Sequence, residues 1–338
     1  MGELSEDLAA EIQQAWQRFL QRTESLRPDL HRFCRALTGS VWDAEDLVQD
    51  TLLRSFAKLG EFQNRIDNPR AYLFRIASNL WIDHFRRADP HRLQVSAAES
   101  ISDLPDPDRG NVQSAEVRDA ASQILQILPP QERAAVILKD VFEFRAEEIA
   151  EMLGTTAGAI KSALHRGREK LAAPRPSRPA APPSTALLDR FVDAFNARDV
   201  ERLAALLRED ATAEVISVGT SRGRNRIRDS EIYYSLFLEK GEPQAERYVY
   251  DGEPIVVIWY PDPEDAAARA VRDVLRFEEA EGRLSRMRFY SFCVETEAEI
   301  LDALGLRFAS FGYGPWTPEF LGAQKQEEFQ AWMAERAK

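Results

Sequence analysis

Thirteen residues near the middle of the chain, AAPRPSRPAAPPS at 172–184, contain five prolines and no large apolar side chain. Proline lacks an amide hydrogen and locks φ, so neither a helix nor a central strand continues through this segment. Prolines at this density favour an extended, semi-rigid spacer. We therefore expect a domain boundary here, and a chain of 338 residues is long enough for two or three domains.

The charge balance limits how the chain can meet nucleic acid. The 44 Lys and Arg residues and 56 Asp and Glu residues give a formal net charge of −12, which argues against a protein that coats DNA through bulk positive charge. Any DNA contact must be local. Residues 1–173 hold 22 basic and 27 acidic residues, whereas 184–338 hold 20 and 29, so the acidity is concentrated in the second half.

Cysteine usage and hydropathy point to a cytoplasmic protein. Cys34 and Cys293 are far apart, each within an apolar stretch, which predicts buried thiols in place of a disulfide framework or zinc ligands. No apolar run reaches the ~18 residues of a membrane span. The first residues, MGELSEDLAAEIQQAW, are acidic where a signal peptide is basic and then apolar. We expect no membrane partner, no metal and no cofactor.

Residues 1–173 show helical periodicity, interrupted by an acidic, proline-containing stretch at about 88–115. Asp43 is a good N-cap for a helix that runs to Leu59, and Pro69 sits where a second helix can begin. Apolar residues recur every three or four positions along both segments. The pattern predicts a small helical bundle.

The most specific local pattern is FRAEEIAEMLGTTAGAIKSALHRGREKL at 144–171. Its apolar spacing is that of two short helices packed at a steep angle, with Gly154 at the turn between them and Thr156 as a cap of the second. The exposed face of that second helix is basic and comprises Lys161, Ser162, His165, Arg166, Arg168 and Lys170. Such a helix fits the major groove of DNA. A merely charged surface helix is the alternative.

Beyond the proline-rich segment the periodicity changes. Two short helices are expected before and after a break near Asn196 to Asp199. The segments 254–260, 268–277 and 283–294 are rich in β-branched and aromatic residues and are bounded by Gly, Pro and Asp, as strands are. The second half is therefore expected to be α+β, with a last helix at about 317–336.

Two segments resemble one known family. LPPQERAAVILKDVFEFRAEEIAEMLGTTAGAIKSALHRGREKL at 128–171 resembles region 4 of the extracytoplasmic-function (ECF) sigma factors of bacterial RNA polymerase. DAEDLVQDTLLRSFAKLGEFQNRIDNPRAYLFRIASNLWIDHFRR at 43–87 resembles their region 2. The resemblance implies an initiation factor that binds core RNA polymerase, at its clamp helices and flap, and that recognises and melts promoter DNA.

The resemblance also assigns roles to single residues. Polymerase binding falls to Asp46, Gln49 and Asp50. Recognition and melting of the minus-ten element fall to Phe62, Asn64, Asn79, Asp83, Arg86 and Arg87. Recognition of the minus-thirty-five element falls to Lys161, Ser162, His165, Arg166 and Arg168. For the helix predicted to begin at Asp43, the alternative is a merely solvated face. For the aromatic residues Tyr72, Trp81 and Phe85, the alternative is a position in the core.

The recognition helix departs from the family pattern. Ala159, Ala163 and Gly167 replace larger or polar residues that are often found there. We therefore expect fewer side chains to reach bases, with discrimination left to the remaining polar residues of the helix.

The second half resembles a different family. LLDRFVDAFNARDVERLAALLREDATAEVISVGTSRGRNRIRD at 187–229 resembles the start of SnoaL-like domains, which are cone-shaped α+β folds with a pocket. The chain is thus expected to be multidomain, with two all-α sigma domains followed by an α+β SnoaL-like domain. The expected parts are a region 2 helical domain (1–90), an acidic linker (91–115), a region 4 helix-turn-helix domain (116–172), a Pro-rich linker (173–184), the SnoaL-like domain (185–296) and a C-terminal extension with a helix (297–338).

Two functions remain open for this combination. In the first, the SnoaL-like domain contacts the sigma domains of the same chain and regulates them, and the chain is not an enzyme. In the alternative, a DNA-binding regulator is fused to a small-molecule-binding or catalytic SnoaL-type domain, whose pocket Arg276, Tyr290 or Trp259 would line. Residues 184–338 contain no histidine, which removes the commonest general base and counts against catalysis. The C-terminal helix is expected to pack on the sigma regions or on the mouth of the pocket.

Overall fold

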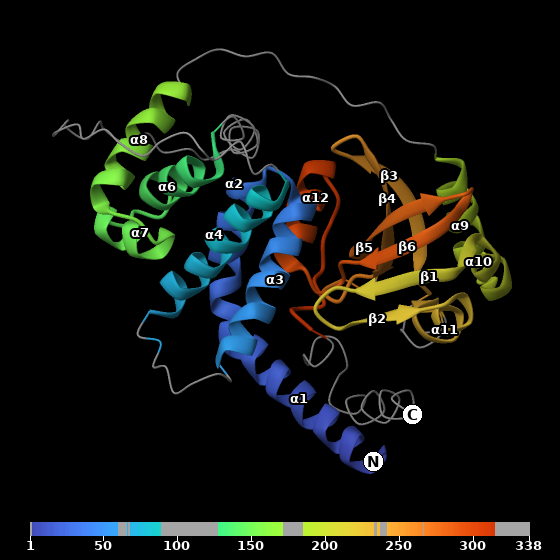
Figure 1. Ribbon diagram of the computed structural model, residues 1–338. Helices are drawn as coiled ribbons and strands as arrows, with labels where there is room; N and C mark the ends of the chain where they lie inside the picture. The colour runs from blue at the N-terminus through green and yellow to red at the C-terminus, as the bar shows by residue number, and fades with distance from the viewer. Residues whose placement is uncertain are drawn as a thin grey trace. The chain divides into compact units, whose positions relative to one another are not determined.

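The computed structural model describes residues 2–59, 66, 68–88, 128–171, 185–232, 235–236, 242–265 and 267–314, with the backbone alone at 2–10, 13, 59, 86–88 and 168–171. The chain divides into two compact units, Met1–Pro176 and Ser177–Lys338, which are described separately (Figure 1). The division falls inside the predicted Pro-rich linker. Both predicted linkers, 91–115 and 173–184, and the predicted helix at 317–336 lie outside the described residues.

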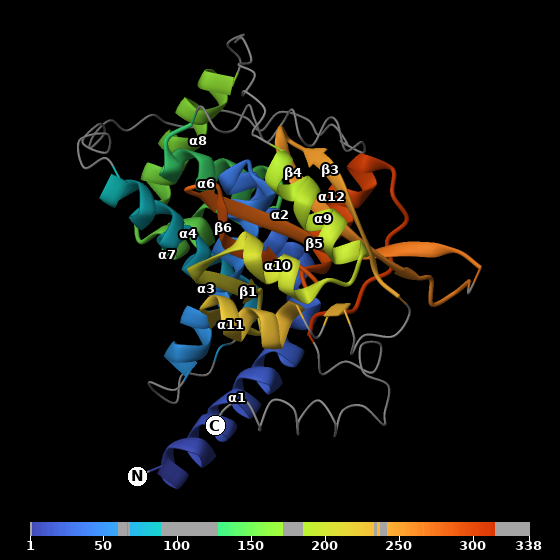
Figure 2. The same ribbon diagram turned by 90° about the vertical axis from the view of Figure 1, so that its right-hand side faces the viewer.

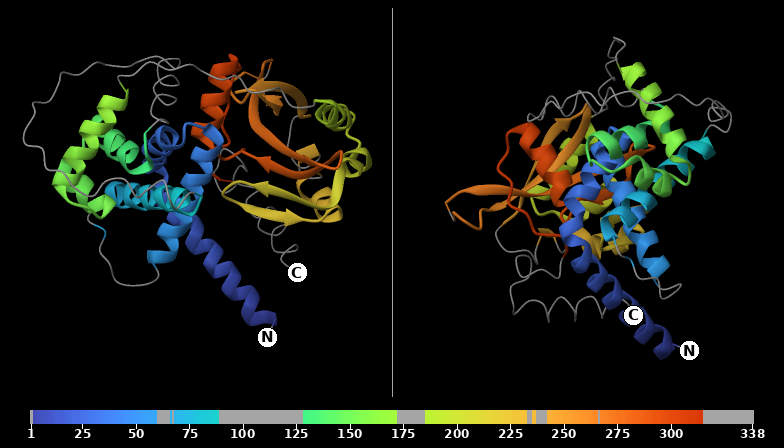
Figure 3. Two further views of the ribbon diagram at one scale, coloured as in Figure 1. Left: turned by 45° about the horizontal axis from the view of Figure 1, so that its top comes forward. Right: turned by 90° about the vertical axis from the view of Figure 1, so that its left-hand side faces the viewer.

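The first unit is helical throughout its described residues, as predicted. Its elements are α1 (Gly2–Thr23), the 3-10 turn η1 (Glu24–Leu26), α2 (Arg27–Thr38), α3 (Val41–Leu59), α4 (Pro69–Ala88), α6 (Pro130–Asp140), α7 (Ala146–Leu153) and α8 (Ala157–Leu171). Helices α2, α3 and α4 pack on one another, and α6 packs with α7 and α8. Helix α1 extends away from this bundle (Figure 3). The two helical parts, expected as separate domains, contact each other through α2, α4, α6 and α7.

The ends of α3 and α4 differ in how well the sequence predicted them. The N-cap prediction for Asp43 was wrong: α3 begins at Val41, and the Asp43 amide donates to the Ser40 hydroxyl at 3.3 Å. A serine just before two apolar residues is the better cap because the helix must bury Val41 and Trp42 in its first turn. The predicted start of α4 at Pro69 is confirmed, and the side chain of Asn68 accepts a hydrogen bond from the amide of Ala71 at 3.0 Å.

The second unit is α+β, which confirms the predicted class. Its elements are α9 (Ala186–Asn196), α10 (Val200–Leu206), β1 (Leu207–Val215), β2 (Gly219–Arg222), α11 (Arg224–Ile227), the π-helical turn η2 (Arg228–Ile232), β3 (Gln244–Tyr250), β4 (Glu253–Pro261), β5 (Arg269–Ala280), β6 (Arg283–Phe289) and α12 (Val294–Leu304). The break between α9 and α10 is where the sequence placed it, and the Asp199 side chain caps α10.

A six-stranded mixed sheet organises this unit. The strand order is β2-β1-β6-β5-β4-β3, with β1 and β6 parallel and the other neighbours antiparallel. Helices α9, α10 and α11 lie together at one end of the sheet (Figure 2). One face of the sheet joins α9 in an apolar core, where the Phe191 ring lies 4.8 Å from that of Phe277 on β5.

The core continues beyond the predicted end of this domain. The boundary predicted at 296 falls inside α12. Further on, Phe308 forms a bridge to Val271 of β5, and Phe311 is a buried member of the core. The third predicted strand, by contrast, ends at Phe289 and not at 294, because the chain turns at 291–292 to begin α12.

The prediction of two buried thiols is confirmed. Cys34 and Cys293 are both free and buried, and burial raises the pKa of Cys34 well above its usual value. Within the described part of the chain, no helix is long and apolar enough to cross a membrane.

Candidate nucleic-acid interface

Helices α7 and α8 form the predicted helix-turn-helix. Gly154 ends α7 in the left-handed conformation, with φ 64°, where a side chain would be strained. The Thr156 hydroxyl accepts a hydrogen bond from the amide of Ala159 at 3.2 Å and so caps α8. Ile149 of α7 and Ile160 of α8 are buried. The predicted turn and cap are confirmed.

Three of the predicted DNA-reading residues share the outward face of α8. Lys161 and His165 are exposed one turn apart, and Ser162 beside them is half-buried. The Ser162 hydroxyl donates to the Gly158 carbonyl at 3.1 Å, which holds this side chain close to the helix. A lysine, a serine and an imidazole on one exposed helix face can donate to guanine edges and to phosphates.

Arg166 is placed differently from the other predicted DNA-reading residues. Its Nε donates to Glu132 Oε1 of α6 at 2.9 Å, and the Glu132 side chain is only 8% exposed. This pair ties α8 to α6, so at least one guanidinium donor serves packing. The side chain of Arg168, the fifth predicted residue, lies outside the described residues.

Packing explains two of the small residues of α8, a role that the sequence analysis did not predict. Ala163 and Gly167 are both buried, Gly167 against Val136 of α6, and neither faces outward. A Cβ at Gly167 would lie 2.8 Å from Val136 Cγ2. The expectation that these two residues thin out the DNA-reading face was therefore wrong, because they lie on the opposite side of the helix. Ala159 is exposed, as that expectation required.

Two of the predicted minus-ten residues lie on the exposed side of α4. Asn79 and Asp83, one turn apart, are both exposed. The backbone of Arg86 and Arg87 continues α4, and their side chains lie outside the described residues, as do Phe62 and Asn64. Among the nearby aromatic residues Trp81 is buried, with its ring 4.5 Å from that of Phe85, so the core alternative holds for Trp81.

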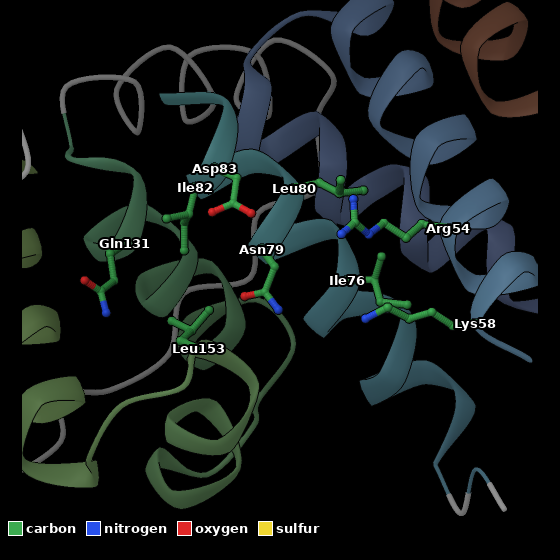
Figure 4. Close-up of a pocket in the computed structure, with 9 residues that line it drawn as sticks. All are labelled: Arg54, Lys58, Ile76, Asn79, Leu80, Ile82, Asp83, Gln131 and Leu153. Carbon is green, nitrogen blue, oxygen red and sulfur yellow. The ribbon is translucent and has the colours of Figure 1, made fainter. Parts of the chain in front are cut away.

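Asn79 and Asp83 line a cleft of about 310 Å³ (Figure 4). The other lining residues are Arg54 and Lys58 of α3, Ile76, Leu80 and Ile82 of α4, Gln131 of α6 and Leu153 of α7. Figure 4 shows the two α4 residues between the basic side chains of α3 on one side and Gln131 and Leu153 on the other. The sequence analysis did not predict that Arg54 and Lys58 line this cleft, although basic residues four positions apart lie on one face of a helix.

The predicted polymerase-binding residues lie along α3. Asp50 is exposed and Asp46 is half-exposed, one turn before it. Partial desolvation by the surrounding protein, with a further contribution from the Asp46 carboxylate, raises the pKa of Asp50. Leu53 extends the same face with 53% of its surface exposed, an unusual exposure for a large apolar side chain among the described residues.

Gln49 is turned partly inward. Its side-chain amide donates to Glu45 Oε1 at 2.5 Å, and the same carboxylate forms a buried ion pair with Arg27 of α2 at 3.0 Å. Both members of that pair are almost completely buried, so removal of either one leaves a buried charge. Through this hydrogen bond Gln49 helps to hold the buried ion pair between α3 and α2.

Two of the three residues proposed for a pocket in the second unit lie together, since Tyr290 is fully buried and interacts with Arg276. Trp259 lies on the opposite face of β4 from the core residues Val256 and Ile258, and its indole donates to Glu246 at 3.0 Å. Arg276 donates two hydrogen bonds to Glu253, at 2.7 and 3.0 Å. Among the described residues no group of three or more His, Cys, Asp or Glu side chains is placed to hold a metal ion.

Three family models match the chain, in the order expected from the motifs. They are Sigma-70 region 2 at residues 23–90, Sigma-70 region 4 at 118–171 and a SnoaL-like domain at 188–287. The first two contain α2–α4 and α6–α8, and the third contains α10 and all six strands apart from the end of β6.

Sequence relatives and a solved structure carry the same family name. The ECF RNA polymerase sigma factor SigG of Mycobacterium tuberculosis is 35% identical over 228 residues, which cover 58% of this chain and 61% of SigG. The chain thus spans less than two thirds of that relative. The crystal structure of the Mycobacterium tuberculosis ECF sigma factor SigJ aligns with a TM-score of 0.31 and 23% identity, over 80% of this chain and 95% of SigJ.

The ECF sigma factor SigD of Mycobacterium bovis is matched over most of its length. It is 32% identical over 155 residues, which cover 44% of this chain and 72% of SigD. With regions 2 and 4 both matched and in order, the chain belongs to the ECF RNA polymerase sigma factors.

Proposed function

We propose that this chain is a transcription initiation factor that binds core RNA polymerase and directs it to promoters. The observation that carries the proposal is the outward face of α8, where Lys161, Ser162 and His165 are presented by a helix-turn-helix whose other face is buried. This local face is rich in hydrogen-bond donors, so it can bind DNA although the protein as a whole is acidic, with a net charge of −12. Membership of the sigma family supports the proposal.

The exposed face of α4 is the proposed site for the minus-ten element. Asn79 and Asp83 offer an amide and a carboxylate one turn apart, groups that hydrogen-bond to the edges of unpaired bases. Arg86 and Arg87 follow on the same helix and would contribute phosphate contacts. Extruding a base costs a few kcal/mol of stacking, which such contacts offset.

The α3 surface formed by Asp46, Asp50 and Leu53 is the proposed contact with the polymerase clamp helices. It combines two carboxylates with an exposed leucine, so it suits a partner that offers basic side chains around an apolar contact. Charge removal at Asp46 and Asp50 together (D46N/D50N) should weaken binding to core polymerase. Asp43 is exposed on the first turn of the same helix, and D43N is the matched control.

The decisive experiment is transcription in vitro with purified core polymerase and a library of DNA fragments. Transcripts that start at defined sites only when the protein is present support the proposal, and an unchanged transcript set would contradict it. Lys161→Ala should weaken promoter binding about tenfold, which corresponds to one lost direct contact. Arg190→Ala, which removes an exposed arginine from α9, is the charge-matched control.

We further propose that the second unit regulates the first and does not catalyse a reaction. Two observations support this: residues 184–338 contain no histidine, and the core face of the sheet is lined by apolar side chains. A tether of 13 residues keeps a piece of net charge −9 close to the helices of the first unit. Ending the chain at Ala173 should change promoter-directed transcription, whereas unchanged output with an intact helical fold would refute regulation in cis.

A further inference from the structure

An aromatic and acidic surface lies at one edge of the sheet in the second unit. Among the described strands, β3 is the last of the sheet on that side. One carboxylate oxygen of Glu246 on β3 accepts two hydrogen bonds, from the Tyr248 hydroxyl at 3.1 Å and from the Trp259 indole of β4 at 3.0 Å. The two rings are half-buried and the carboxylate is exposed. These three residues are called the edge surface below.

The carboxylate of the edge surface is not neutralised by a cation. In the part of the chain that the structure describes, Glu246 pairs with no basic side chain, and its two bonding partners are neutral. Arg269 lies beside Trp259 but donates to the backbone carbonyls of Glu242, at 2.9 Å, and of Trp259, at 2.7 Å. A carboxylate between aromatic rings suits a guanidinium, which bonds to the acid and stacks on the rings.

The edge surface also has the side chains on which proline-rich segments dock. Such segments form a polyproline II helix, which is ordered before it binds and packs on exposed Trp and Tyr rings. Residues three apart in this helix lie on one face, about 9 Å from each other. An arginine next to the prolines would reach the carboxylate. The expected ligand is therefore a proline-rich segment that carries a positive charge.

The chain contains such a segment directly before the second unit's first helix. Residues 177–184 read SRPAAPPS, in which Arg178 precedes two prolines three positions apart, Pro179 and Pro182. Helix α9 begins at Ala186 and packs on β3. In its first turn Asp189 bonds to Arg247 of β3 at 2.6 Å. The segment is thus joined to the unit next to the strand that carries Glu246 and Tyr248.

The segment is long enough to reach the edge surface. Arg247 faces α9, so its neighbours Glu246 and Tyr248 point to the opposite face of the sheet, where Trp259 also lies. A ligand that starts at α9 must therefore pass round β3. Eight residues of polyproline II helix span roughly 25 Å, whereas neighbouring strands are only about 4.8 Å apart. Because β3 is an edge strand, no further strand blocks this path among the described residues.

We propose that residues 177–184 dock on the edge surface, with Arg178 on the Glu246 carboxylate and the prolines against the rings of Tyr248 and Trp259. This inference does not depend on the regulation proposed above. Docking removes eight of the 13 residues at 172–184 from the free tether. A segment with a Kd of about 0.1 mM as a free peptide is about 90% docked at an effective concentration of about 1 mM.

Quenching by tryptophan measures docking in the full-length chain. A bimane dye is attached at Ala180→Cys within the segment, and the native Cys34 and Cys293 are buried and so stay unlabelled. Trp259 quenches the dye only on contact, so Trp259→Phe should raise the emission at least about twofold when most of the segment is docked. Trp16→Phe, which removes a tryptophan from α1, should leave the emission unchanged.

Substitutions in the segment and in the carboxylate test the two contacts separately. Pro179→Ala/Pro182→Ala should raise the emission as Trp259→Phe does. These prolines precede α9, so this variant decides the question if circular dichroism shows that Trp259→Phe does not fold. Glu246→Gln should also raise the emission. Glu279→Gln removes an exposed carboxylate near the far end of β5 and is the matched control.

A labelled peptide of sequence SRPAAPPS tests the same surface from outside. Its apparent affinity should be about tenfold higher for the Pro179→Ala/Pro182→Ala chain than for the unchanged chain, whose own segment occupies the surface about 90% of the time. Fluorescence anisotropy measures both affinities.

Emission that does not change with the proline substitutions would overturn the proposal. Equal peptide affinity for the two chains would also overturn it and would assign the edge surface to a proline-rich segment of another protein. Quenching that falls on dilution would assign the segment to a second copy and exclude docking within one chain. None of these measurements uses DNA or polymerase, so a failure of the proposed function leaves them unaffected.

Discussion

At the scale of single residues, the smallest side chains of α8 explain how region 4 is packed. Gly167 meets Val136 of α6 so closely that a Cβ would lie 2.8 Å from Val136 Cγ2 and 3.6 Å from Leu128 Cδ1. Valine is stiff at χ1 and cannot swing away easily. The glycine at 167 therefore lets α6 and α8 approach closely.

Two glycines of the same helix make a matched pair of tests. Gly167→Ala should destabilise the first unit by about 1–3 kcal/mol because the added methyl group overpacks the contact with α6. Gly158→Ala should stabilise it by about 0.5–1 kcal/mol, since the nearest atom to its Cβ is Thr156 Oγ1 at 4.0 Å and alanine favours the helix. Urea unfolding followed by far-UV circular dichroism measures both changes. Equal effects of the two substitutions would contradict this account of Gly167.

An ion pair in the second unit should make its stability depend on acid. Arg307 donates to the buried carboxylate of Asp262 and holds the pKa of Asp262 below its usual value. A lowered carboxyl pKa contributes stability above about pH 4, and this contribution is lost as pH falls through the lower folded-state pKa. Arg307 also precedes Phe308, which bridges to β5, so the pair holds the segment after α12 on the sheet.

Asp262→Asn should lower the melting temperature of the second unit near pH 7, and the difference from the unchanged chain should shrink as the pH falls through the lowered folded-state pKa of Asp262. Glu264→Gln is the control, because Glu264 meets the same arginine with 82% of its side chain exposed and should have little effect. Thermal unfolding across a pH series, with hydrogen exchange of the β5 amides to identify the transition, gives the answer. A difference that stays constant with pH would exclude the ion pair as its cause.

At the scale of elements, α8 combines two roles on two faces. Its outward face carries Lys161 and His165, while Arg166 at its flank is bonded to Glu132 of α6. A helical sequence identifies which residues share a face, but a long arginine at the border can turn toward either side. The sequence therefore predicted the helix, its cap at Thr156 and its turn at Gly154. It assigned Arg166 to DNA because the contact with the carboxylate of Glu132 on α6 has no local sequence pattern.

Alanine at each of two basic residues should separate these roles. Arg166→Ala should destabilise the first unit by about 1–3 kcal/mol, since it removes a charge-assisted bond to a nearly buried carboxylate. Lys161→Ala should leave the free energy of unfolding within about 0.5 kcal/mol of that of the unchanged chain. It should weaken binding to DNA that carries the minus-thirty-five element. Urea unfolding and DNA titration on both proteins test the assignment. Loss of stability from Lys161→Ala, with none from Arg166→Ala, would reverse it.

At the scale of the whole molecule, local signals predicted the parts better than their contacts. The proline-rich segment, Pro69 and the periodicity of 1–173 place the boundary and the helices, since these effects act within a few residues. Contacts between segments that are far apart in the sequence produce no local sequence pattern. Phe142 and Phe144 resemble ordinary core residues in the sequence, yet their rings meet α2 and α4 across more than 60 residues. Phe311 likewise joins the core of the second unit although it follows the predicted end of that domain.

The tether between the two units offers the last test, because its length sets how strongly the second unit can act on the first. Effective concentration falls roughly as the −3/2 power of the length of a flexible tether, so replacing the 13 residues at 172–184 by a Gly-Ser tether of equal length and then doubling that tether should lower it about threefold. The change in transcription caused by ending the chain at Ala173 should shrink accordingly. Residues 184–338 added as a separate chain should act only near millimolar concentration. Transcription that responds to truncation but not to tether length would show that the second unit acts without leaving and rebinding the first.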